Sequence, residues 1–328
     1  MSFGAGVGSM PGEDYAEALR VVLGETPDLV AIPELPDRGV QAAMTGRGMG
    51  ILAELGADLQ PAGWRLTGAG SGADQRRARS MLAQDLDTVE EQLQGFDGLL
   101  KVQVTGPWTL SATVERPRGD RILADHGARR DLAQSLAEGI GDHLSGVSAR
   151  VPGASLILQV DEPALTAVLN AQIPTASGWG RHRSIDKPEA DAALRAVAEA
   201  GRSSGARTVL HSCAPDVPVA LAAGAGFDAV SFDLSLATPG DQWAAAFDSG
   251  LDLWPGVVPS TDADGVNDRV LGKRIEDFFS ALGFGIDAYA DRLVVTPTCG
   301  LAGASPTWAR RALALSAALA KSIAGSDR

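Results

Sequence analysis

The 328-residue chain is poor in cysteine, histidine and aromatic residues, with two cysteines, four histidines and 5% aromatic residues. Two cysteines, Cys213 and Cys299, do not make the disulfide framework of a small secreted domain, so we expect a reducing, cytoplasmic location. The most apolar late stretch, residues 312–320, is too short to cross a bilayer. The first residues lack a basic segment followed by an apolar core, and no signal peptide is expected.

Basic residues are also scarce, since 28 Lys and Arg stand against 41 Asp and Glu, a formal net charge of −13. Such a surface repels phosphate backbones and anionic lipids, so neither nucleic acid nor a membrane is an expected partner. Hydrophobic residues make up 45% of the chain and charged residues 21%, which is typical of a globular protein and excludes wholesale disorder.

Eight short apolar, β-rich runs alternate with helical patterns along the whole chain. Nearly continuous runs such as Leu156-Ile157-Leu158-Gln159-Val160 are typical of parallel strands covered by helices. We therefore predict an α/β fold, a (β/α)8 TIM barrel that forms one domain over residues 1–328. The predicted strands are residues 3–8, 29–33, 100–105, 155–160, 207–210, 228–232, 250–254 and 292–297, and the predicted helices are 14–23, 78–93, 129–148, 189–203, 217–223, 241–247, 264–281 and 307–323.

The alternative is an open doubly wound sheet that binds a dinucleotide at Gly4-Ala5-Gly6-Val7-Gly8. These glycines do not follow the spacing G-x-G-x-x-G after a strand, and the run itself is typical of a first strand. The closed barrel is the preferred interpretation.

Reactive side chains gather where the predicted strands end. In a barrel, the carboxyl ends of the strands form the face that carries the active site. Residues two apart in an extended segment point the same way, so His211 and Cys213 are predicted to face one centre. Six reactive residues lie just after the ends of predicted strands. Ser9 follows the first strand, Asp161 the fourth, His211 and Cys213 the fifth, Asp233 the sixth and Cys299 the eighth.

One imidazole, two thiolates and a carboxylate on this face predict a tetrahedral zinc site, because soft sulfur ligands select zinc over magnesium or calcium. A metal-bound thiol is deprotonated near neutral pH, which favours activation of a thiol for alkyl transfer. Hydrolysis by zinc-bound water is a second possible reaction. The structural alternatives are that the cysteines are small buried apolar residues and that Asp161 and Asp233 cap helices.

Five short motifs appear in an order that resembles the catalytic, C-terminal barrel of cobalamin-independent methionine synthase, as a single-barrel relative. The resemblance extends from residue 7 to about residue 301, and full-length members of the family carry a second, N-terminal barrel. The motifs are Val7-Gly8-Ser9-Met10-Pro11, Val104-Thr105-Gly106-Pro107, Gln159-Val160-Asp161-Glu162-Pro163-Ala164-Leu165, Leu210-His211-Ser212-Cys213 and Pro297-Thr298-Cys299-Gly300-Leu301.

The resemblance implies a zinc-dependent methyltransferase that converts homocysteine to methionine. It implies zinc ligation by His211, Cys213, Cys299 and Asp233, with Asp233 in place of the family's glutamate. It also implies that Asp161 and Glu34 hold the amino group of homocysteine and that Ser9 lies near its carboxylate.

The folate-binding half of the family's site is absent from the motifs. Ala167 stands where the family has a folate-contacting glutamate, Thr113 where it has a pterin-stacking tryptophan, and residues 256–260 lack the proton-donating histidine. A methylfolate needs a positioned acid to protonate its leaving amine, so we expect another methyl donor, a methylated corrinoid or a corrinoid protein. Two alternatives remain: alkyl transfer to another thiol such as coenzyme M, and a non-catalytic barrel that binds zinc or a thiol.

Overall fold

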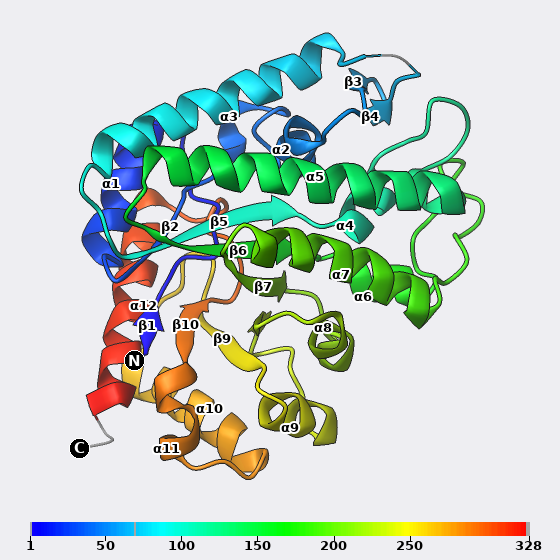
Figure 1. Cartoon of the computed structure of the whole chain (residues 1–328). Helices are drawn as coiled ribbons and strands as arrows, with labels where there is room; N and C mark the ends of the chain where they lie inside the picture. Colours follow the sequence, from blue (N-terminus) through cyan, green and yellow to red (C-terminus); the bar gives the residue numbers. More distant parts are fainter. Residues whose placement is uncertain (1, 69, 326–328) are drawn as a thin grey trace.

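A computed structural model describes residues 2–68 and 70–325 of the chain. Eight parallel strands form one sheet in the order β1-β10-β9-β8-β7-β6-β5-β2, surrounded by helices (Figure 1). The predicted (β/α)8 barrel is confirmed, and each predicted strand run contains or overlaps one strand of this sheet. The strands are β1 (Phe3–Gly4), β2 (Leu29–Ala31), β5 (Leu99–Thr105), β6 (Ser155–Asp161), β7 (Arg207–Ser212), β8 (Ala229–Asp233), β9 (Asp252–Val258) and β10 (Val294–Pro297).

The eight predicted helices are also present. They are α1 (Tyr15–Glu25), α3 (Ala73–Gln92), α5 (His126–Arg150), α7 (Lys187–Ser203), α8 (Val219–Ala225), α9 (Asp241–Asp248), α10 (Asp268–Ala281) and α12 (Pro306–Gly325). Short helices α4 (Pro107–Thr113), α6 (Leu165–Leu169) and α11 (Ile286–Tyr289) were not predicted. Among the described residues, no helix is both long and apolar enough to span a membrane.

The barrel closes between its edge strands β1 and β2 through the segments that follow them. Ser9 and Glu34 form a parallel bridge. The Met10 amide donates to the Glu34 carbonyl at 2.8 Å, and the Glu34 amide donates to the Gly8 carbonyl at 3.1 Å. The seam is thus joined at the carboxyl end of the barrel, at Ser9 and Glu34, which the family resemblance predicts to bind the substrate.

The interior of the barrel changes from apolar to polar toward its carboxyl end. The apolar layer consists of Ala5, Leu29, Ile157, Val209, Ala229, Trp254 and Val294. Two residues further along three of these strands lie Gln159, His211 and Ser231, all buried. Because side chains two apart share a face, the polar layer lies above the apolar one and supports the carboxyl-end face.

The segment between β2 and α3 contains two elements that the sequence did not predict. They are helix α2 (Met44–Ile51) and an antiparallel hairpin of β3 (Ala57–Gln60) and β4 (Gly63–Leu66). Glycines obscure the helical pattern of α2, and close packing requires two of them. A Cβ on Gly46 would overlap the Val40 carbonyl, and one on Gly48 would lie 2.8 Å from the Leu110 side chain.

Candidate active site

A cavity of about 200 Å³ opens at the carboxyl end of the barrel. Six of the seven residues predicted to form the site line it together, and only Asp233 does not. Most of the other lining side chains are apolar, so the cavity offers a few polar groups in a largely dry wall. The lining residues are Val7, Ser9, Glu34, Pro36, Ala42, Met44, Asp161, Pro163, His211, Cys213, Cys299 and Gly300.

His211, Cys213 and Cys299, three of the four predicted zinc ligands, form a cluster that could hold a metal ion. Their ligand atoms all lie within 4.8 Å of one another, and the two Sγ atoms are 2.6 Å apart. Two thiolates bound to one tetrahedral zinc at 2.3 Å would be about 3.8 Å apart, so binding requires the sulfurs to separate by about 1 Å. The donor set, one nitrogen and two sulfurs, fits zinc.

The strand register orients the histidine of this cluster. β7 and β8 pair His211 with Ser231, and the Ser231 hydroxyl lies 3.0 Å from His211 Nδ1. The Cys213 thiol lowers the pKa of Cys299 to about 4 by hydrogen bonding, and His211 adds to the effect. The same sulfur contact, reinforced by burial, raises the pKa of Cys213. The contact between the two sulfurs thus shifts their pKa values in opposite directions.

Asp233 ends β8 and pairs with Gly256 of β9. Its Oδ1 accepts hydrogen bonds from the Ser235 amide at 2.8 Å and the Ser235 hydroxyl at 2.7 Å. That oxygen holds the turn after β8, and the side chain lines two larger neighbouring cavities. Zinc ligation by Asp233 stays a prediction, and it would rely on the other carboxylate oxygen.

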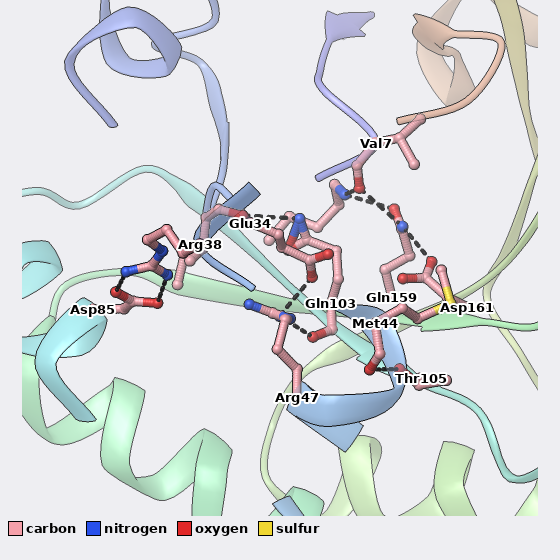
Figure 2. Close-up of polar contacts among 12 residues, drawn as sticks. Val7, Glu34, Arg38, Met44, Arg47, Asp85, Gln103, Thr105, Gln159 and Asp161 are labelled. Atoms are coloured by element: carbon pink, nitrogen blue, oxygen red, sulfur yellow. Dashed lines mark hydrogen bonds and ion pairs between the residues drawn. The ribbon is translucent and has the colours of Figure 1, made fainter. Parts of the chain in front are cut away.

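Elsewhere in the wall of the cavity, Glu34 is paired with a cation that the sequence analysis missed. Arg47 on α2 donates from Nη2 to Glu34 Oε1 at 2.5 Å and to the Gln103 carbonyl at 3.3 Å (Figure 2). Both partners are buried. Burial raises the pKa of Glu34 to about 7, and Arg47 opposes this rise. Arg47 was missed because its helix was not predicted.

Asp161 is held by a second buried group. Its Oδ1 accepts from Gln159 Nε2 at 2.7 Å, and Gln159 Oε1 accepts from Lys101 Nζ at 2.5 Å. Burial raises the pKa of Asp161, opposed first by His211, and burial lowers the pKa of Lys101 to about 8. A lysine in a β-strand suggests an exposed side chain. Lys101, however, lies two residues after Leu99, which packs against the apolar layer inside the barrel, so Lys101 shares that inward face.

The neighbouring Glu162 is structural. Its carboxylate accepts from the amides of Trp108 and Thr109 and from the Thr109 hydroxyl, at 2.7 to 2.8 Å. These donors belong to the first turn of α4, so Glu162 fastens that helix to the barrel. The helix-cap alternative for Asp161 is not supported by the contacts described, because the observed side-chain donor to Asp161 is Gln159.

The barrel presents an imidazole and two cysteine sulfurs at its carboxyl-end face, where barrel enzymes carry their active sites, and these three side chains could hold a metal ion. Residues 87–322 match the sequence model of one family, described as the catalytic domain of cobalamin-independent synthase. The chain belongs to this family. Membership supports a methyltransferase activity like that of methionine synthase.

Two solved structures share the fold over nearly their whole length. A B12-independent methionine synthase from a Shewanella species, in complex with selenomethionine, has 14% identity and a TM-score of 0.62, with 98% of each chain covered. A methyltransferase from Methanosarcina mazei has 14% identity and a TM-score of 0.54, with 98% of this chain and 94% of that chain covered. No curated protein matches the sequence.

Proposed function

We propose that the protein is a zinc-dependent methyltransferase that methylates the thiol of homocysteine to give methionine. One observation carries this proposal. A single small cavity joins the His211, Cys213 and Cys299 cluster to two buried carboxylates, Glu34 and Asp161. The cluster suits a sulfur atom, and the carboxylates suit an ammonium group.

The chain's own residues bind and orient the acceptor. His211, Cys213 and Cys299 would hold zinc, with Asp233 as the proposed fourth ligand, and bound zinc would supply a Lewis acid that ionises the acceptor thiol. Asp161 and Glu34 would accept hydrogen bonds from the acceptor's ammonium group. The hydroxyl of Ser9 would lie near its carboxylate, while the apolar walls exclude water. The new S–CH3 bond forms as the bond from the methyl group to its donor breaks.

The rim beside the cavity disfavours a folate polyglutamate as the methyl donor. A groove of about 880 Å³ borders the cysteine cluster at Ala214 and contains four carboxylates and one lysine. These carboxylates would repel a tail of glutamates. We therefore propose a methylated corrinoid, free or carried on a partner protein, as donor. The acidic side chains of the groove are Asp186, Asp216, Asp233 and Asp241.

The nature of the cavity also separates homocysteine from coenzyme M, the alternative thiol. Coenzyme M carries a sulfonate and no ammonium group, so Glu34 and Asp161 would repel it. Arg47, the nearest arginine to these carboxylates in the described contacts, is already paired with Glu34. We also propose that residues 1–328 act as one catalytic domain in a reducing, cytoplasmic setting, which suits its two free cysteines.

Zinc analysis and turnover together test the proposal. The wild type should hold one zinc per chain and methylate homocysteine from methylcobalamin faster than from methylfolate, whereas Cys299→Ser and His211→Ala should lose zinc and activity together. Stoichiometric zinc in both variants would refute the proposed ligands. Tight zinc without turnover from any methyl donor would favour a non-catalytic binding barrel.

A further inference from the structure

Lys101, in the middle of β5, is a fully buried charged residue inside the barrel. Its side chain is 0% exposed. An ammonium group removed from water is strongly destabilised unless its surroundings replace the lost hydrogen bonds. No carboxylate is among its described hydrogen-bond partners, which are a carbonyl and an amide. A position this unfavourable, directly below the candidate site, indicates a function.

The contacts of Lys101 determine which way a neighbouring amide points. Lys101 Nζ donates to the Val7 carbonyl at 2.7 Å and to Gln159 Oε1 at 2.5 Å. The amide oxygen of Gln159 therefore faces the lysine. Its nitrogen donates one hydrogen to the same Val7 carbonyl at 2.9 Å and the other to Asp161 Oδ1 at 2.7 Å. Figure 2 shows Val7, Gln159 and Asp161 joined in this chain.

Reversal of that amide would reverse its effect on Asp161. With the ammonium of Lys101 in place, Gln159 can present only its NH2 group to the carboxylate, because its oxygen is held at the opposite end. A flipped amide would place an oxygen against the carboxylate oxygen and push it away. Lys101, together with the Val7 carbonyl that accepts from Gln159 Nε2, thus keeps Asp161 in one orientation, with Oδ1 engaged and Oδ2 available.

The second carboxylate of the cavity is arranged in the same manner. Arg47 engages Oε1 of Glu34, which leaves Oε2 available. The charges of Lys101 and Arg47 both oppose the rise that burial causes in the pKa of Asp161 and of Glu34. The two available oxygens belong to residues that line the same cavity.

We propose that Lys101 is a positioning residue that acts through Gln159 to orient Asp161 toward the ammonium group of an amino-acid thiol. It thereby determines specificity for acceptors that carry an α-amino group over otherwise identical thiols. This inference rests on the proposed function, because it takes the cavity to be the acceptor site.

The test compares homocysteine with 4-mercaptobutyrate, which has the same chain and no amino group. Lys101→Met keeps the length of the side chain and removes its charge. We expect KM for homocysteine to rise about tenfold or more, as for loss of a charge-assisted hydrogen bond, with kcat nearly unchanged. The kinetics with 4-mercaptobutyrate should change less than twofold. Lys273→Met, at an exposed lysine of α10, is the matched control and should leave both thiols unaffected.

A double variant tests whether the effect passes through Gln159. If it does, Lys101→Met combined with Gln159→Leu should raise KM for homocysteine no more than the stronger single variant. Additive effects would overturn the proposed route. An equal loss for the two thiols would show that Lys101 is only structural and would overturn the proposal.

Calorimetric binding of the two thiols separates this inference from the proposed function. If no donor supports methyl transfer, yet Lys101→Met still weakens binding of homocysteine selectively, the proposed function fails and the inference stands. If the wild type methylates homocysteine but binds 4-mercaptobutyrate equally well, the proposed function stands and the inference fails. A wild type that binds neither thiol contradicts both.

Discussion

Replacement of Lys101 should change how the stability of the protein depends on pH. Burial lowers the pKa of Lys101 from 10.5 to about 8. Between these values the unfolded chain binds more protons than the folded one, so the free energy of unfolding rises with pH. At about 1.4 kcal/mol per pKa unit, the whole rise is about 3 kcal/mol. About 2 kcal/mol of it should appear between pH 7 and pH 9.5.

The assay is urea unfolding of the wild type and of Lys101→Met at both pH values. At pH 7 the variant avoids the free-energy cost of burying a charged ammonium group. It also leaves the Gln159 amide oxygen without a hydrogen-bond donor, which costs about 1–3 kcal/mol. The two proteins should therefore have similar stability at pH 7. At pH 9.5 the wild type should exceed the variant by about 2 kcal/mol.

The quantity to compare is the difference in the free energy of unfolding between the wild type and the variant. Other groups titrate in the same pH range, and their contributions cancel in this difference. A constant difference from pH 7 to pH 9.5 would show that Lys101 is not destabilised by burial. Lys273→Met, at an exposed lysine, should follow the wild type at both pH values.

Three further perturbations act on the other parts of the site. Because the carboxylate of Glu34 titrates at about 7, KM for homocysteine should rise as the pH falls, about tenfold per unit well below pH 7, in steady-state kinetics. Gly300→Ala should raise KM for homocysteine several-fold, because its Cβ would overlap the Ser9 hydroxyl. Ser231→Ala, which frees His211 Nδ1, should weaken zinc binding about 10- to 100-fold in a chelator competition.

Each of these has an outcome that would contradict it. The pH effect should be absent for 4-mercaptobutyrate, and the same profile for both thiols would assign it to another group. Gly303→Ala is the control for Gly300→Ala, because its Cβ would meet its nearest neighbour at 3.8 Å; equal effects would remove the argument from Ser9. Unchanged zinc affinity in Ser231→Ala would mean that the hydroxyl does not orient the histidine.

Strand periodicity and the position of reactive residues after strands predicted the barrel and most of the polar residues that line the candidate cavity. The proximity of His211, Cys213 and Cys299 could be predicted because the parallel strands of a barrel all end at one face. Ser9, Glu34 and Asp161 followed from the same placement or from the family resemblance, and all three line the cavity.

The supporting cations could not be predicted in this way. Arg47 lies in a helix whose glycines serve close packing, and glycines lower helix propensity in any local pattern. Lys101 sits in a strand where a charged side chain suggests solvent exposure, and only the closed barrel shows that its face points inward. The position of each cation depends on contacts between distant segments. Lys101, for example, contacts Val7, which lies 94 residues earlier in the chain.

The seam between β1 and β2 forms part of the wall of the candidate cavity. Two backbone hydrogen bonds, at the Met10 and Glu34 amides, join the edges where Ser9 and Glu34 also face the cavity. An amino acid that binds to both side chains would add a further non-covalent link between the two edges of the barrel. Exchange of those two amide protons with deuterium should therefore slow when the acceptor is bound. The exchange rate at the seam would then report whether the cavity holds an acceptor.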